Sequence, residues 1–191
     1  MSRRDAGAPS DLEAQDGLPV PRRYWAVATI TLGLSLSVLS TAIANVALPA
    51  MGKDLGVDPA TSIWIITAYQ IAVTVALLPL SSLGDILGYT RVYRAGIAIF
   101  LLASLACALA DSLQTLVIAR VFQGLGAAGI MAVNAALVRF TYPRAQLGRG
   151  MGMNTLIVAG SSASGPSIAA AILAVAPWPW LFAFNLPIGL A

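Results

Sequence analysis

The sequence contains no histidine and a single cysteine, Cys107. A Ser-His-Asp triad and a histidine-bearing zinc site are therefore excluded, and no disulfide can form within the chain. Charged residues make up 10% of the 191 positions, against about 25% in soluble domains. The sequence also contains no paired carboxylates and no nucleotide-binding loop, so it does not predict an enzyme. We expect no catalytic residue, no metal site and no cofactor.

Apolar residues are abundant instead. They account for 58% of the chain, and the mean hydropathy is +0.82. A membrane-spanning helix needs about 20 mainly apolar residues, so 191 residues after a polar leader leave room for about six. The basic residues are dispersed among short loops, which orients a membrane protein and does not indicate a nucleic-acid partner. The composition predicts an all-α integral membrane protein.

The expected organisation follows the alternation of apolar and polar stretches. Residues 1–23 mix Arg, Asp, Gly and Pro without periodicity and predict a disordered cytoplasmic leader; residues 24–191 form the transmembrane bundle. The expected spans are at about 25–49, 63–83, 95–110, 113–138 and 150–176, with a sixth that starts at 180 and is incomplete at 191. Three spans, a basic loop and nearly three more suggest two three-helix repeats at the front of a longer polypeptide.

The distribution of Lys and Arg predicts the orientation. Nine of the eleven lie in the leader or in loops on one side, whereas Lys53 lies on the other side and Arg120 lies inside a span. By the positive-inside rule, the N-terminus and the charged turn at 81–94 face the cytoplasm. The expected location is the cytoplasmic membrane, crossed several times. The third span is almost purely apolar, and we expect it to face lipid.

Polar residues at membrane depth are the first functional candidates. Ser37, Thr41 and Asn45 recur every four residues and therefore share one helix face. Arg120 carries a full charge on a face that continues through Gln123. Two interpretations of Arg120 stay open: it snorkels to the outer headgroups or forms a structural ion pair, or it belongs to a transport pathway.

The other spans contribute further candidates. The second places Trp64, Thr67 and Gln70 near one another, although Trp64 also fits an interfacial aromatic belt. The fifth carries small residues at four-residue spacing, which permits close helix packing. Pro166 follows Gly165 directly and favours a kink in that helix.

Several motifs, in order, resemble a known family. They are STAIANVALP at 40–49, SSLGDILGYTRVY at 81–93, ARVFQGLGAAG at 119–129, AGSSASGPSIAA at 159–170 and WPWLFAFNLPIG at 178–189. Their order and spacing resemble the N-terminal half of a major facilitator superfamily transporter. The similarity is greatest to the fourteen-span drug:proton antiporter branch of the EmrB/QacA type. The fold implied is a six-helix bundle with its sixth helix truncated.

The resemblance implies roles for particular residues. An inner gate would lie between the second and third helices, an intramembrane charge would serve proton coupling, and the fifth helix would contain a hinge. These sets are Gly84, Asp85, Gly88 and Arg91 for the gate, Arg120 and Gln123 for coupling, and Gly160, Gly165 and Pro166 for the hinge. The substrate-pathway candidates are Ser37, Ser40, Thr41, Asn45, Trp64, Thr67, Gln70, Asn134 and Asn154.

The sequence departs from this family pattern in informative places. Ser40 stands where the branch often has an acidic residue, and no Asp or Glu lies deep in any span. Ile86 and Tyr89 stand where basic residues are frequent in the gate motif. Proton coupling would therefore require Arg120 with a partner on the absent C-terminal half, or would not occur.

The resulting hypothesis is a transporter that works by alternating access. It would use the proton gradient to export small hydrophobic or cationic compounds, with the lipid bilayer, the substrate and the C-terminal half as its partners. One alternative is a facilitator or importer of a metabolite without proton coupling. Another is a membrane scaffold subunit that transports nothing.

Overall fold

The structure is a computed structural model that describes residues 19–190, and within that range every regular element is a helix. The elements are α1 (Val20–Asp54), α2 (Pro59–Ser62), α3 (Trp64–Leu87), α4 (Tyr89–Ala108), α5 (Leu113–Thr141), the 3-10 turn η1 (Arg144–Gln146), α6 (Leu147–Val175), α7 (Pro179–Ala183) and α8 (Asn185–Leu190). Five segments, α1, α2–α3, α4, α5 and η1–α6, are long and apolar enough to cross a membrane. The prediction of an all-α membrane bundle is confirmed.

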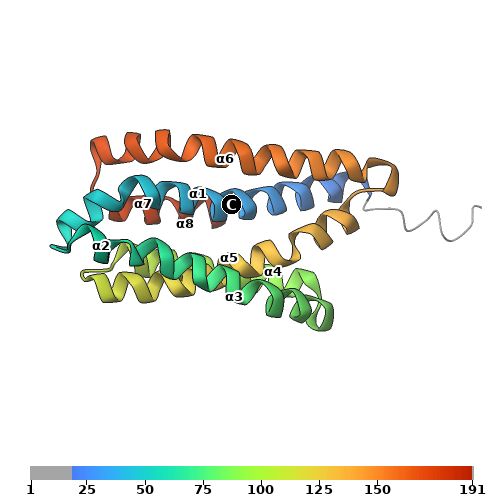
Figure 1. Cartoon of the computed structure of the whole chain (residues 1–191). Coiled ribbons are helices and arrows are strands. Elements are labelled where there is room, and N and C mark those ends of the chain that lie inside the picture. Colours follow the sequence, from blue (N-terminus) through green and yellow to red (C-terminus); the bar gives the residue numbers. More distant parts are fainter. Residues whose placement is uncertain (1–18, 191) are drawn as a thin grey trace, which may run out of the picture.

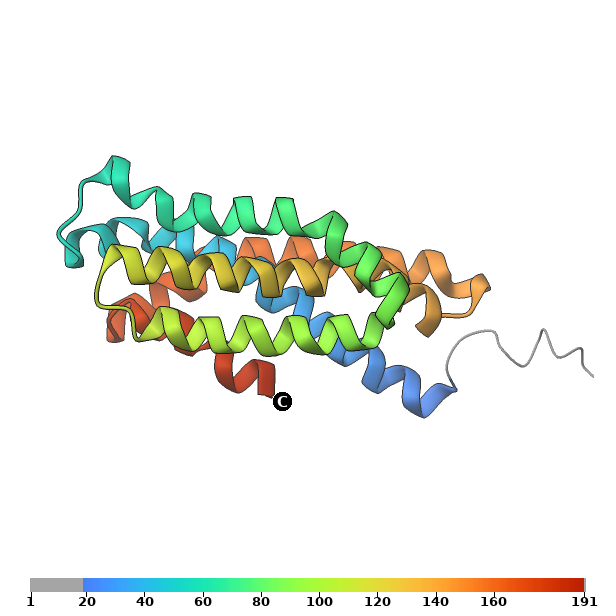
Figure 2. The ribbon, with the colours of Figure 1, turned by 90° about the horizontal axis from the view of Figure 1, so that it is seen from below.

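The long helices run side by side in two layers (Figure 1). α1 packs mainly against α6, and α5 packs against both α3 and α4. Figure 2 shows α5 between α3 and α4. α7 and α8 turn back along α1 and α4. The six-helix order expected from the sequence is therefore present, with the sixth position filled by the two short helices α7 and α8.

The first helix extends beyond its predicted span at both ends. It begins at Val20, so the last residues assigned to the leader are helical, while residues 1–18 lie outside the described part. Pro21 sits in the first turn, where its missing N–H has no helical partner to lose. Pro49, predicted to end the span, lies inside the helix, which continues to Asp54. A membrane helix tolerates an interior proline when neighbouring groups satisfy the freed backbone.

The charged turn predicted at 81–94 is much shorter than expected. α3 runs to Leu87 and α4 begins at Tyr89, so Gly88 alone joins them. Gly88 has φ 93°, a left-handed conformation that glycine adopts without steric cost. Asp85 and Arg91 therefore project from helix ends and not from a loop.

The prediction that the third span faces lipid was wrong for one side of α4. That side buries eight residues, among them Phe100 at 0% exposure, against α5 and its neighbours. The helices approach closely because both carry glycine at the contact: a Cβ added to Gly126 would lie 2.5 Å from the backbone nitrogen of Phe100. A hydropathy pattern cannot reveal this contact, because lipid and a packed helix are equally apolar.

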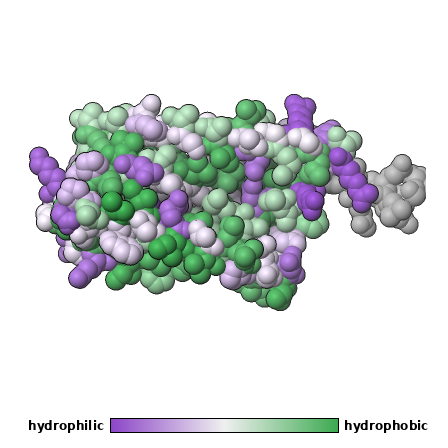
Figure 3. Space-filling view, viewed as in Figure 1, coloured by the Kyte–Doolittle hydropathy of each residue, from purple (hydrophilic) through white to green (hydrophobic). Residues whose placement is uncertain are grey.

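Charges are segregated to the ends of the bundle. Apart from Arg120, the described arginines lie at the start of α1, the start of α4, and the α5–α6 junction; these ends lie together in Figure 1. This arginine-rich end comprises Arg22, Arg23, Arg91, Arg94, Arg139, Arg144 and Arg149. Lys53 and three of the four described aspartates lie at the helix junctions of the opposite end. In Figure 3 hydrophilic colours gather at both ends, and the middle is mostly apolar.

Three hydrogen bonds join α1 to the α3–α4–α5 layer. The Tyr93 hydroxyl of α4 donates to the Thr29 carbonyl at 2.6 Å, and the Tyr69 hydroxyl of α3 donates to the Ser37 carbonyl at 3.1 Å. The third comes from Arg120 of α5 and reaches the Ser40 hydroxyl. In all three α1 supplies the acceptor.

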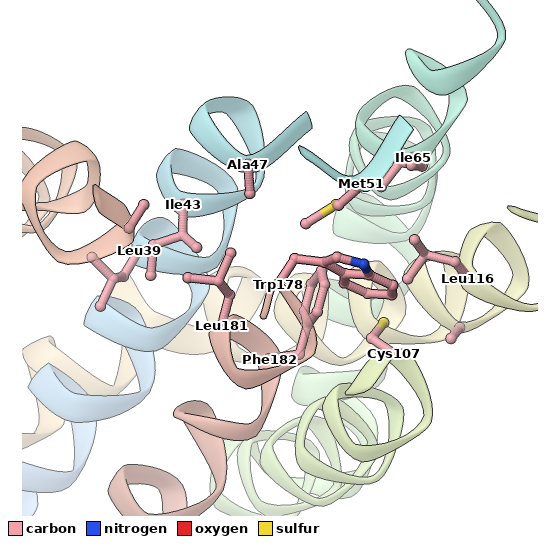
Figure 4. Close-up of a cluster of buried hydrophobic side chains, with 12 residues drawn as sticks. Leu39, Ile43, Ala47, Met51, Ile65, Cys107, Leu116, Trp178, Leu181 and Phe182 are labelled. Carbon is pink, nitrogen blue, oxygen red and sulfur yellow. The ribbon is translucent and has the colours of Figure 1, made fainter. Parts of the chain in front are cut away.

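The end opposite the arginine-rich end is closed by an apolar cluster beneath α7. Phe182 and Trp178 insert between α1 and the α4–α5 pair and contact Met51 and Cys107 among others (Figure 4). The indole Nε1 of Trp178 donates to the Asp54 carboxylate at 2.7 Å, which fixes the start of α7 to the end of α1.

We expect Trp178→Phe to lower the free energy of unfolding by about 2 kcal/mol or more, because the hydrogen bond to the Asp54 carboxylate is lost and the smaller ring leaves a void in the buried cluster. Thermal unfolding of the detergent-solubilised chain, followed by helical circular dichroism, measures this. Trp180→Phe is the control, since Trp180 is 60% exposed. An equal loss of stability in both variants would contradict a specific role for the bond.

Candidate functional site

A groove lies between the two layers, midway along the bundle. It has a volume of about 380 Å³ and is formed by α1, α3, α5 and α6. Its lining is amphipathic and carries no charged side chain. The polar groups belong to Ser37, Thr41, Asn45, Tyr69, Gln70 and Ser162, and the apolar ones to Val38, Ala42, Val73 and Met131. We call this the polar groove.

One wall of the polar groove is the stripe predicted on the first helix. Ser37 donates to the Gly33 carbonyl at 3.0 Å, Thr41 to the Ser37 carbonyl at 3.3 Å, and Asn45 to the Thr41 carbonyl at 3.0 Å. These bonds use donors of the stripe and leave its side-chain oxygens as acceptors. The groove can therefore accept hydrogen bonds from a polar edge while its apolar residues contact a flat hydrophobic surface.

Next to this groove, Arg120 of α5 is fully buried at 0% exposure. Its Nε donates to the Ile65 carbonyl at 3.1 Å, and its Nη1 donates to Ser40 Oγ at 3.3 Å and to Gln123 Oε1 at 2.6 Å. The guanidinium carbon lies 4.2 Å from the Tyr69 ring centroid and 5.7 Å from that of Phe182. The snorkelling interpretation is therefore wrong, because the side chain points into protein and not towards headgroups.

The bonds of Arg120 continue into a polar network in the core. Gln123 Nε2 donates to Ser104 Oγ at 2.7 Å, and Asn185 Nδ2 of α8 donates to the same hydroxyl at 3.5 Å. Cys107 Sγ lies 3.9 Å from Gln123 Oε1. Helices α1, α3, α4, α5 and α8 all contribute to this network, so the charge is held where five helices meet.

The charge of Arg120 has no carboxylate partner among residues 19–190. It is the only buried charged side chain there, and its Nη2 has no hydrogen-bond partner. The four described aspartates are all exposed and near helix ends. Burying an arginine in this way is costly, so its local compensation consists of hydrogen bonds and aromatic faces.

At the arginine-rich end, the predicted gate residues surround the α3–α4 joint. Gly84 is buried, and a Cβ there would lie 2.9 Å from the Tyr89 ring. The Tyr89 hydroxyl donates to the Asp85 carboxylate, so a tyrosine holds this acid where the family pattern has a basic residue. Arg91 lies exposed on α4, beside a separate apolar groove with Leu83 and Ile99.

The three predicted hinge residues have different surroundings on α6. A Cβ added to Gly165 would lie 2.4 Å from the Ala42 Cβ of α1, whereas around Gly160 there is open space within 4 Å. Pro166 lies inside α6, which continues through it as one helix. Only Gly165 therefore sits at a close helix contact.

The remaining pathway candidates are scattered. Trp64 is 55% exposed beyond the groove, and Thr67 is half-buried away from its lining. Asn134 is buried with an unpartnered Oδ1. Asn154 lines a narrow crevice between α1, α5 and α6, nearer the arginine-rich end.

The structure also adds residues that the sequence pattern did not select. Ser104 and Asn185 join the Arg120 network, and Tyr69 lies at the groove wall. Tyr69 lies next to the predicted candidate Gln70, but nothing in the spacing assigned it a contact with Arg120. Ser104 lies in a nearly apolar helix without a polar stripe to mark it.

An apolar bundle of membrane length, with a buried charge beside a polar groove, defines a polytopic helical membrane protein of the transporter class. The family model of the Major Facilitator Superfamily matches residues 30–191. The chain belongs to this superfamily, a family of transporters and not of enzymes.

Relatives within the family carry names that refer to different substrates, or to none. The chain is 58% identical over 175 residues to the uncharacterized transporter YebQ of Escherichia coli, covering 92% of the chain and 38% of that protein. It is 34% identical over 170 residues to the riboflavin transporter RibZ of Clostridioides difficile, covering 88% and 37%. It is 36% identical over 166 residues to the putative multidrug resistance protein MdtD of Salmonella paratyphi B, covering 87% and 35%. The chain thus spans less than two fifths of the length of these relatives.

Proposed function

We propose that this chain is the N-terminal half of a proton-coupled exporter of small hydrophobic or cationic compounds. It works by alternating access in the cytoplasmic membrane, with its N-terminus in the cytoplasm. The observation that carries the proposal is the polar groove beside the buried charge of Arg120. In a membrane, a buried ionisable residue beside a hollow is a functional site by default.

The groove supports a flat amphipathic substrate. Its volume of about 380 Å³ lies within the range of small-molecule sites, and its lining combines apolar side chains with hydroxyl and amide groups. Few directional contacts permit several related ligands. The similarity to proteins named as a riboflavin transporter and as a putative multidrug resistance protein supports this class of substrate.

Arg120 supports coupling to protons. Because residues 19–190 hold no buried carboxylate, we infer that the acid that exchanges the proton belongs to the other half of the transporter. The guanidinium then stabilises that acid in its ionised form and is released when the acid is protonated. Alternating access supplies the two arrangements, with the acid near Arg120 in one and distant in the other.

The arginine-rich end supports the orientation and the gate. Seven arginines at one end satisfy the positive-inside rule if that end is cytoplasmic. Asp85, oriented by Tyr89, is positioned there to accept hydrogen bonds from a helix of the other half when the cytoplasmic side is closed.

One observation favours the alternative of a facilitator or importer without proton coupling. Ser40 stands where the related branch often has an acid. Its side chain is uncharged and accepts a hydrogen bond from Arg120. A scaffold subunit that transports nothing is disfavoured, because it has no use for a buried charge beside a groove.

The test is ethidium accumulation in cells that express the full chain, by which we mean the complete transporter with both halves. These cells are compared with cells that express its Arg120→Ala variant at equal membrane abundance. We expect lower accumulation with the unaltered chain and no difference once a protonophore collapses the gradient. If the difference in ethidium accumulation between the two cell lines is unchanged by the protonophore, proton coupling is rejected. Riboflavin entry down its gradient, equally insensitive to the protonophore, would support the facilitator instead.

A further inference from the structure

Tyr69 touches both parts of the site. It lines the polar groove, and the face of its ring lies 4.2 Å from the guanidinium carbon of Arg120. Arg120 does not itself line the groove. The phenol ring is therefore a shared wall, with the groove on one side and the buried charge on the other.

The position of Tyr69 is fixed at both ends. Its hydroxyl donates to the Ser37 carbonyl at 3.1 Å, the same carbonyl that accepts from Thr41. Its backbone packs so closely on α5 that a Cβ on Gly124 would lie 2.6 Å from the Tyr69 carbonyl oxygen. A ring held this way has little room to move. A contact on its groove side therefore presses the ring against its neighbour on the other side, the Arg120 guanidinium.

The guanidinium is sensitive to that ring. Its Nη2 has no partner, and no buried carboxylate compensates it within residues 19–190. A desolvated cation gains more from an aromatic face than a solvated one does. The Tyr69 ring is the nearer of the two aromatic faces around Arg120, at 4.2 Å against 5.7 Å for Phe182.

We propose that Tyr69 is the positioning residue that couples occupancy of the polar groove to the state of Arg120. An occupant that contacts the ring shifts it against the guanidinium and alters the stabilisation of the charge. This deepens the proposed function, because it names the physical link between substrate and coupling site. The link is the ring face, while the hydroxyl sets its position.

The experiment fills the groove without any substrate. Thr41→Cys in the full chain is labelled with benzyl methanethiosulfonate, which places an aromatic group in the groove. The readout is the Arg120 Nε–H signal in a ¹H–¹⁵N spectrum of ¹⁵N-arginine-labelled protein, assigned by its loss in Arg120→Lys. The native Cys107 is at 0% exposure and is spared by the reagent, and Val75→Cys, at a site that is 69% exposed, is the labelling control.

We expect labelling of Thr41→Cys to shift the Arg120 signal, and labelling of Val75→Cys to leave it in place. The shift persists when Tyr69→Phe is added, because the ring remains, and is lost with Tyr69→Leu. Tyr69→Met, whose flexible side chain fills irregular space, replaces the leucine variant if that one does not fold.

Two results would overturn the proposal: no shift on labelling Thr41→Cys, or an undiminished shift without the ring at position 69. Neither depends on a substrate or on a proton gradient. A failure of the exporter hypothesis in the ethidium assay and a failure of the Tyr69 link are therefore distinguishable.

Discussion

Arg120→Met is expected to abolish most transport while leaving the bundle folded. The variant removes the buried charge and fills its volume with an apolar side chain of similar length. Hydrogen bonds to charged groups are worth about 1.5–3 kcal/mol, which corresponds to a loss of about 10- to 150-fold in rate if they act in the transport step.

The same variant separates function from stability, because the two effects have opposite signs. Arg120 is buried without a counter-charge among residues 19–190, so its desolvation opposes folding of this part. Replacing a buried ionic cluster by apolar residues is often neutral or stabilising, and the loss of Arg120 leaves no buried counter-charge unpaired among residues 19–190. We expect the midpoint of thermal unfolding to stay constant or rise. Arg149→Ala is the control, since Arg149 is exposed and its loss removes the same charge.

Both measurements are made on the full chain, as thermal unfolding in detergent and as transport in proteoliposomes. Arg120→Met that transports normally would show that the charge has no role in the cycle. Arg120→Met that fails to fold would show that the polar network is structural.

Gly165→Ala is expected to impair the protein far more than Gly160→Ala, although both replace a glycine of the same helix. A Cβ at Gly165 would meet the Ala42 Cβ at 2.4 Å, so α6 must move away from α1. Overpacking of this kind costs about 1–3 kcal/mol. Around Gly160 there is open space within 4 Å, and alanine there gains up to about 1 kcal/mol of helix propensity.

The comparison also tests whether the two glycines form one hinge. If α6 bends at 160 during transport, Gly160→Ala slows transport while stability stays constant or rises. If the helix moves as one piece, Gly160→Ala transports normally, and only Gly165→Ala loses stability and rate. Equal loss of stability in both variants would contradict a close α1–α6 contact at Gly165 and open space at Gly160. Thermal midpoints and initial transport rates of the two variants provide the measurement.

The sequence was sufficient to predict the number and order of the spans, because length and apolar composition directly report what crosses a bilayer. Helix ends were less predictable. Pro49 was expected to end its span but lies inside α1, and the turn at 81–94 shrinks to Gly88. Helix propensities measured in water overestimate how strongly proline ends a membrane helix, because neighbouring helices satisfy the freed backbone groups.

The candidate site was predictable in part. The four-residue repeat of Ser37, Thr41 and Asn45 does line the groove. The surroundings of Arg120 were not predictable, because its acceptors include a backbone carbonyl, that of Ile65, and carbonyls have no sequence signature. Trp64 and Asn154 each lie on a helix face with other candidate residues, but both lie outside the groove. The spacing of residues shows which of them share a face and does not show which helix that face contacts.

The hydrogen bonds between the layers bear on how this site can diversify. Two of the three acceptors on α1 are main-chain carbonyls, those of Thr29 and Ser37, and every amino acid provides a carbonyl. If the polar groove binds substrate as proposed, mutation at position 37 can change its preference while the bond from Tyr69 to the main-chain carbonyl persists. Only Ser40 contributes its side chain. Under the proposed function, the groove positions of α1 can therefore change with the cargo while the main-chain hydrogen bonds between the layers persist, which is a route to many substrate preferences on one fold.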